Sequence, residues 1–166
     1  MMNGMVTCPG CGAQLYSESH ELDDRANASQ ACRDLYHTLS YYTLSLGDFY
    51  FIHQLAVDAY AAQHYGPRVK PIGITFALVG LYLVNERDYT GRQVQRVHMA
   101  LAKKSKVWPS FRAPKEKAAL TVQDVVRVPD EQKQEMIKKW HVSVWDVWNS
   151  ESELIAHLLK THLEID

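Results

Sequence analysis

Cys8 and Cys11 lie close to the start of the 166-residue chain, in the segment CPGCG. Pro9 and Gly10 between them, and Gly12 after them, predict a tight turn with both thiols on one side. Glycine adopts the positive φ values that let backbone amides approach the sulfurs. Such a knuckle supplies two thiolates, whereas zinc takes four ligands. A redox role for the CxxC pair would need a βαβ pattern, which the sequence lacks. The motif therefore predicts a zinc site that two residues from elsewhere complete.

The third ligand that we expect is Cys32, the only other cysteine in the chain. Free cysteine is also a common core residue, so its place on an apolar helical stripe has a purely structural interpretation as well. The half-filled knuckle in the same chain favours ligation. Three cysteines cannot all pair, and no N-terminal export signal is visible. We therefore expect a cytoplasmic location, where thiols stay reduced and free for metal.

The fourth ligand must come from another residue type, and the eight histidines are the first candidates. Periodicity predicts two helices that form an antiparallel hairpin about Gly47 and Asp48. Cys32 precedes this turn by nearly the same number of residues as His64 follows it, so the two should face each other. His53 lies on the same helix as His64, but about 16 Å away along the axis. The predicted ligand set is therefore the two knuckle cysteines, Cys32 and His64.

Three other residues remain alternative fourth ligands. His53 would replace His64 if the hairpin were staggered, and the polar loop after the knuckle offers His20 or Asp23. The histidines near the C-terminus lack the spacing of three or four residues that stacks ligands on one helical face. We expect these at ordinary polar positions: His141, His157 and His162.

Helical periodicity extends over most of the chain and sets the predicted fold class. Helices are expected over residues 27–46, 48–65, 71–88, 90–106 and 130–148, with a short turn after residue 121 and a last helix that Ser150 and Glu153 cap. An extended pair should flank the knuckle. The prediction is an all-α bundle of about five to six helices with a small N-terminal zinc-knuckle head. We expect a single domain over 1–166, with the knuckle and its loop in 1–26 and the bundle in 27–166.

Composition and charge limit the role of this bundle. With 46% hydrophobic residues the chain should bury enough surface to fold without a metal. A net charge of −1 provides no overall field for nucleic acid or an anionic membrane. The longest apolar run, residues 71–84, is shorter than the roughly 20 residues of a membrane span. Nucleic-acid and membrane partners are therefore not expected, and the sequence does not indicate an oligomeric state.

A binding surface for an unidentified protein or small molecule is sought among the aromatic residues. Trp108 and Phe111 lie in the basic segment KKSKVWPSFRAPKEK, and Trp145 lies in the last long helix. Basic charge with aromatic rings is the combination that binds single-stranded nucleic acid, but in a neutral chain such a segment is usually a solvated loop. Tryptophans on a helical stripe usually belong to the core. These three residues are the candidate binding surface if they are exposed.

Several segments of the sequence together form a recognisable pattern: CPGCG, ACRDLYHTL, FIHQLAVDAYAAQHYG, VNER, LTVQDVV and HVSVWDVW. With them the chain resembles a bacterial family of unknown function that has a cysteine head, a VDAYA-x-QH helix and a tryptophan-bearing C-terminal helix. The resemblance implies matches at the three cysteines, His53 and His64, and it implies no activity. Ala77 stands where the family pattern has a histidine, which argues against a second histidine-rich metal centre.

Two functions from different classes follow from these features. The first is a non-catalytic binding or interaction module with a structural zinc, because a thiolate-rich site fills all four positions. The second is a metal-dependent enzyme resembling DinB/YfiT-type helical bundles, with a position open to water or a thiol for hydrolysis or thiol transfer. The three-cysteine head favours the first. The sequence also lacks a nucleophile elbow and a phosphate-binding glycine loop, so we expect no catalytic residues.

Overall fold

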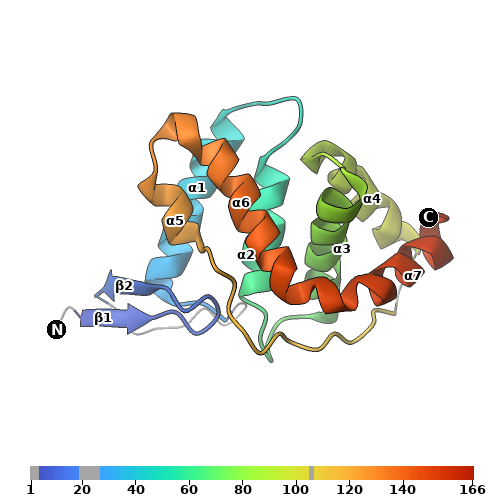
Figure 1. Ribbon diagram of the computed structural model, residues 1–166, viewed down its shortest axis with the longest axis horizontal. Helices are drawn as coiled ribbons and strands as arrows, with labels where there is room; N and C mark the ends of the chain where they lie inside the picture. The colour runs from blue at the N-terminus through green and yellow to red at the C-terminus, as the bar shows by residue number, and fades with distance from the viewer. Residues whose placement is uncertain (1–3, 19–26, 105–106) are drawn as a thin grey trace.

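The computed structural model describes residues 4–18, 27–104 and 107–166, and helices dominate this part of the chain (Figure 1). Six of its helices have eleven residues or more, and α5 is shorter. The helices are α1 (Gln30–Ser45), α2 (His53–Gln63), α3 (Pro71–Arg87), α4 (Gly91–Lys104), α5 (Val122–Arg127), α6 (Asp130–Trp148) and α7 (Ser152–Leu163). The predicted all-α bundle is confirmed. None of the described helices is both long and apolar enough to cross a membrane.

The N-terminal head is a two-stranded hairpin at one end of the bundle (Figure 1). Strands β1 (Gly4–Thr7) and β2 (Gln14–Ser17) pair antiparallel, with Thr7 opposite Gln14. The knuckle is the turn between them, which confirms the predicted extended pair. The boundary expected at residue 26 lies outside the described residues.

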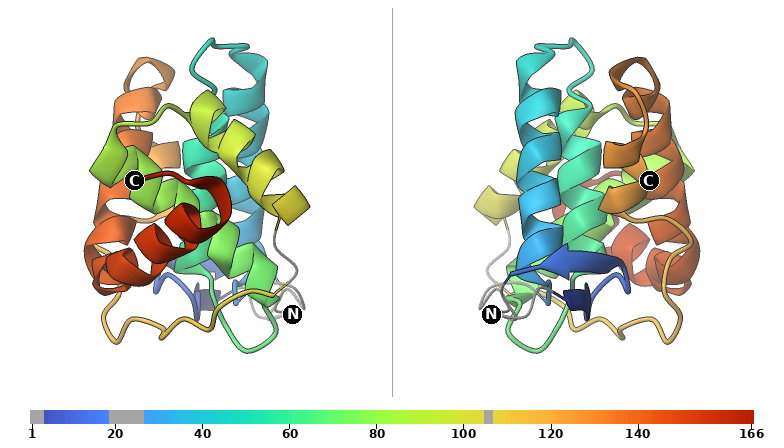
Figure 2. Two further views of the ribbon diagram at one scale, coloured as in Figure 1. Left: turned by 90° about the vertical axis from the view of Figure 1, so that its right-hand side faces the viewer. Right: turned by 90° about the vertical axis from the view of Figure 1, so that its left-hand side faces the viewer.

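Helix α2 lies centrally and packs against α3 and α6, while α1 runs beside it on one side (Figure 2). It begins at His53 rather than at Asp48, so the predicted start is wrong by five residues. The reason is local. Phe51 adopts a left-handed φ of 55°, which a helix cannot continue, and the Asp48 carboxylate accepts the Ile52 N–H (2.9 Å) inside this loop.

The predicted cap of the last helix is also wrong. Residues Asn149–Glu151 form a 3₁₀ turn, and α7 follows it without a side-chain cap. Glu151 instead accepts the backbone N–H of Arg112 (2.9 Å) and so holds the long loop before α5. The capping box predicted at the start of α4 is confirmed, because Thr90 and Gln93 exchange side-chain to backbone hydrogen bonds.

The aromatic residues proposed as a binding surface are mostly buried. Trp145 is 4% exposed and its indole N–H donates to Glu86 (2.7 Å), while Phe111 is 7% exposed. Trp108 is partly buried and meets the Phe76 ring edge-on. Neither Trp145 nor Phe111 offers an exposed surface, so that prediction is wrong for both. Both side chains pack in the core instead, where they bury a large apolar area.

A buried carboxyl group lies where α2 and α3 pack together. Asp58 is 3% exposed, accepts a hydrogen bond from Gln54 (3.0 Å) and leaves Oδ2 without a partner among the described residues. A Cβ on Gly80 would overlap this oxygen, so the glycine makes room for the carboxyl group. Burial raises the pKa of Asp58 well above 3.8, although the Gln54 hydrogen bond acts in the opposite direction.

We expect Asp58→Asn to stabilise the protein increasingly as the pH rises. A raised folded-state pKa gives stability that is present below about pH 3.8 and is lost as the pH rises toward the folded-state value. Asparagine cannot ionise, so the difference in unfolding free energy should grow by about 1.4 kcal/mol per pH unit over that interval. Urea unfolding from pH 4 to pH 8 measures it, with Asp146→Asn on the exposed side of α6 as the charge-matched control. Equal pH profiles for the Asp58 and Asp146 variants would contradict this account.

Candidate metal centre

The knuckle between β1 and β2 is closed by backbone hydrogen bonds. The Cys8 N–H donates to Ala13 O (2.8 Å) and the Gly12 N–H donates to Cys8 O (2.8 Å). Gly12 has a φ of 80°, as the sequence predicted for a glycine here. The Ala13 N–H then points to the Cys11 sulfur (3.5 Å). This turn places both thiols on the side that faces the helices.

Cys32 comes from the first turn of α1 and is completely buried. Ser29 caps this helix by accepting the Cys32 N–H (3.3 Å), and its own N–H points to the Cys8 sulfur (3.5 Å). The cap therefore fixes the start of α1 directly against the knuckle. Backbone N–H groups at a helix start also stabilise negative charge on nearby thiolates.

His64 is the C-cap of α2, directly after its last residue, and is 1% exposed. Its Nδ1 donates to Tyr60 O (2.7 Å), since a backbone carbonyl can only accept. The Nε2 lone pair is thus left for a metal, the arrangement usual for a ligating histidine. The imidazole also packs on the Tyr60 ring, with centroids 4.0 Å apart, which holds its orientation.

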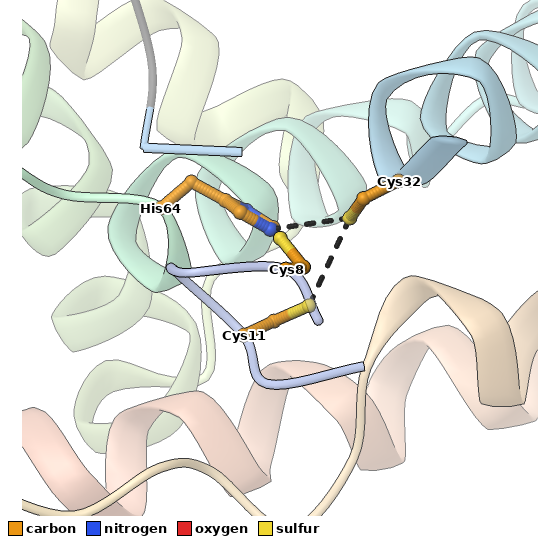
Figure 3. A group of neighbouring side chains, drawn as sticks. All are labelled: Cys8, Cys11, Cys32 and His64. Atoms are coloured by element: carbon orange, nitrogen blue, oxygen red, sulfur yellow. Dashed lines mark hydrogen bonds between the residues drawn. The ribbon is translucent and has the colours of Figure 1, made fainter. Parts of the chain in front are cut away.

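Four donor atoms meet at this point (Figure 3). The ligand atoms of Cys8, Cys11, Cys32 and His64, here called the Cys3His cluster, all lie within 4.8 Å of one another, and all four residues are buried. The Cys11 and Cys32 sulfurs are 3.8 Å apart, and the Cys32 sulfur is 3.3 Å from His64 Nε2. Ligands around a tetrahedral zinc would be separated by about 3.8 Å for two sulfurs and about 3.5 Å for sulfur and nitrogen. The cluster has the donors and the spacing of a candidate zinc site.

Without a cation, the pKa values of the cluster residues shift in different directions. Hydrogen bonds from Cys11 and Cys32 lower the pKa of Cys8, while hydrogen bonds to Cys11 and Cys8, together with burial, raise the pKa of Cys32. Burial lowers the pKa of His64, but its hydrogen bonds and charge interactions with Cys11 and Cys8 raise it to about 9. For all three thiols to ionise in this buried space, a compensating positive charge is needed, which a divalent cation would provide.

The alternative fourth ligands lie elsewhere. His53 is at the opposite end of α2, where its Nδ1 lies 2.8 Å from the Thr43 hydroxyl oxygen. It does not take part in the cluster. His20 and Asp23 lie outside the described residues. The hairpin of α1 and α2 therefore brings Cys32 to His64, as the residue count predicted, and not to His53.

Three residues around the cluster were not anticipated: Lys117, Asn27 and Ser29. Lys117, from the loop before α5, donates to both Pro9 O and Gly10 O (2.7 Å each) and so ties that loop to the knuckle. The Asn27 N–H donates to His64 O (3.0 Å). Ser29 could have been recognised as a helix cap three residues before Cys32, but no sequence signal links Lys117 or Asn27 to the knuckle.

Gly10→Ala is expected to weaken metal binding at least about tenfold. A Cβ at Gly10 would overlap Asn27 O and lie 2.6 Å from His64 Cδ2, so the knuckle or the imidazole must move. Displacing the groups that orient a ligand typically costs 10–100-fold in affinity. A zinc competition titration with a chromophoric chelator measures this, and Gly4→Ala in β1 is the control because its Cβ would meet nothing within 4 Å. Equal affinity of the two variants would show that the close approach at Gly10 is not required.

Comparison with known protein families matches residues 6–149 to the family described as "Family of unknown function (DUF5946)". The matched range contains all four residues of the Cys3His cluster. No curated protein and no solved structure matches the chain.

Proposed function

This chain belongs to DUF5946, a family of unknown function, and we propose that it is a zinc-binding helical protein that acts by binding rather than by catalysis. The observation that carries the proposal is the Cys3His cluster, in which three sulfurs and one imidazole nitrogen converge within 4.8 Å in a buried space. Cys8, Cys11, Cys32 and His64 are the proposed ligands.

The donor set favours zinc over other metals. Thiolates are soft ligands that select zinc or other thiophilic ions, whereas magnesium and calcium take oxygen ligands. Three sulfurs and one imidazole in tetrahedral spacing are typical of structural zinc sites. The thiols are free of disulfides, which suits a reducing compartment such as the cytoplasm.

The burial of the cluster supports a structural role. Cys8 and Cys32 are fully buried, and Cys11 and His64 are at most 3% exposed. Four protein ligands would leave no position for water or substrate, and a catalytic zinc needs such a position. Bound zinc would supply a cross-link here. It would join three separate segments: the β hairpin, the start of α1 and the end of α2.

The metal content of the purified protein tests this proposal. Protein prepared without chelators should contain one zinc per chain by elemental analysis. A variant with Cys8→Ser and Cys11→Ser, which removes the knuckle thiols, should contain none. Native protein without zinc or any other thiophilic metal would overturn the proposal.

A further inference from the structure

Positive charge is concentrated in the middle of the chain. Residues 89–115 contain seven Lys or Arg residues and no Asp or Glu. The rest of the chain has eleven basic and nineteen acidic residues, and therefore a net charge of −8. Such a division of charge along a chain is typical of proteins with an anionic partner. The net charge of −1, which argued against such partners, conceals this division.

Helix α4 arranges part of the positive charge on one exposed face. Arg96, Met99 and Lys103 follow one another at intervals of three and four residues, and all three are exposed. They lie on the side of α4 opposite the apolar residues that pack into the core, which are Val94, Val97 and Leu101. Lys104 extends the exposed face at the end of the helix. The face carries no carboxylate, because α4 contains no acidic residue.

The start of α3 adds a further basic residue beside the end of α4. His98 Nε2 donates to Phe76 O (2.7 Å), and the two rings stack with centroids 4.9 Å apart. Only three residues separate α3 from α4, so the two packed helices run in opposite directions (Figure 2). Phe76 is five residues after the start of α3, and His98 is six before the end of α4. Lys70 and Lys104 therefore lie at the same end of this helix pair.

We call Lys70, Arg96, Lys103 and Lys104 the basic patch. All four side chains are exposed. None of them makes a hydrogen bond or an ion pair with another residue in the part of the chain that the structure describes. Unpaired like charges on one face repel one another and attract an anionic surface.

The apolar side chains near the basic patch favour a lipid bilayer over nucleic acid. Met99 is 60% exposed between Arg96 and Lys103, and the neighbouring Ile72 is 38% exposed. Aliphatic side chains of this kind insert between lipid headgroups. Single-stranded nucleic acid is instead bound by exposed aromatic rings that stack on the bases. The tryptophan that follows α4, Trp108, is partly buried against the core.

The shape of the surface also favours a bilayer over an acidic peptide. Four hollows on the described surface are lined by residues outside the basic patch. A peptide gains affinity by lying in a groove or along a strand edge, whereas a bilayer needs only an exposed face.

We propose that the basic patch docks this protein on a bilayer of anionic phospholipids. The four basic side chains lie among the lipid phosphates, and the Met99 side chain inserts between the headgroups. The association is peripheral, since no described helix can cross a membrane. Each Lys or Arg close to an anionic leaflet strengthens binding by about fivefold. The inference goes beyond the proposed zinc site and does not depend on it.

Sedimentation with lipid vesicles tests the proposal on the full-length, zinc-containing protein. We expect binding to vesicles of phosphatidylglycerol mixed with phosphatidylcholine, but not to vesicles of phosphatidylcholine alone. Binding should be lost when the ionic strength rises from about 0.01 M to about 1 M, because the Debye length falls from about 30 Å to about 3 Å.

Two pairs of adjacent lysines provide a matched comparison. Replacing both Lys103 and Lys104 by Gln should weaken vesicle binding by about twentyfold, the effect of two basic residues. Replacing both Lys138 and Lys139 by Gln changes the net charge equally, at exposed positions of α6, which packs on α2 and α3. This second variant should bind within about twofold of native. Circular dichroism checks that both variants keep the fold.

A change without charge separates a bilayer from other polyanions. Met99→Ser should weaken vesicle binding by about two- to fivefold, because one apolar side chain no longer inserts. Val142→Ser is the control at a 47% exposed site on α6 and should bind as native.

The proposal is overturned if native protein ignores anionic vesicles, binds phosphatidylcholine vesicles equally well, or loses equal affinity with either lysine pair. Equal affinity of the Met99 and Val142 variants would also contradict it. Binding of a single-stranded oligonucleotide or a polyglutamate peptide without binding of vesicles would assign the patch to another partner and overturn the proposal. Zinc content measured on the same samples separates these outcomes from failure of the metal proposal.

Discussion

Removal of the metal by a chelator should release the β hairpin and the first turn of α1 while the helical core stays folded. The hairpin is held to the bundle at the Cys3His cluster, by the hydrogen bonds of Lys117 and by the buried side chains of Ala13 and Leu15. The core rests on many buried side chains outside the cluster, among them Leu81 and Leu101. It therefore does not need the roughly 10–16 kcal/mol of metal-binding energy on which zinc fingers depend to fold.

Hydrogen exchange measured before and after chelation tests this division. Amides of β1, β2 and the first turn of α1 should exchange at least about a hundredfold faster, because local opening no longer has to break metal bonds. Amides in the middle of α3 and α6 should keep their protection, and the far-ultraviolet helical signal should largely remain. Adding zinc back should restore the slow exchange. Loss of most of the helical signal on chelation would contradict an independent core.

His64→Ala should weaken zinc binding by at least about a hundredfold. Removing a group that merely orients a ligand costs about 10–100-fold, and removing the ligand itself should cost more. His53→Ala is the matched control. It removes an imidazole from the same helix, but one that lies beside Thr43 and outside the cluster. Its zinc affinity should stay within about twofold of native.

The same titration decides among the alternative ligands. His20→Ala should also bind zinc as the native protein does, because the cluster already has four donors without it. If His64→Ala binds normally while His53→Ala or His20→Ala loses the metal, the assignment of the fourth ligand is wrong. Circular dichroism of each variant shows whether the fold is kept.

The cluster could be anticipated from the sequence because its geometry depends on simple regularities. A CxxC segment with glycines makes a knuckle almost regardless of its surroundings. The pairing of Cys32 with His64 followed from counting residues on either side of a turn. The count succeeded although α2 begins five residues later than predicted. Cys32 lies 13 residues before the end of α1, and His64 lies 11 residues after the start of α2. The axial distances from these residues to the turn between the helices therefore differ by only about 3 Å.

Other features depend on contacts that one segment cannot encode. The left-handed conformation of Phe51, which delays α2, has no signal in residue type. Burial of Trp145 and His141 depends on which helices cover α6. The contact of Lys117 with the knuckle joins residues more than 100 positions apart. Periodicity identifies an apolar stripe, but tertiary packing decides which polar and aromatic side chains are enclosed with it.

X-ray absorption at the zinc edge of the purified protein tests the central claim most directly. We predict a four-coordinate zinc with three sulfurs at about 2.3 Å and one nitrogen at about 2.0–2.1 Å. The spectrum should not change when substrate-like thiols are added, because no coordination position is open. A site with fewer than three sulfurs, or with a bound water that an added thiol displaces, would contradict a closed structural zinc and favour a metal-dependent enzyme.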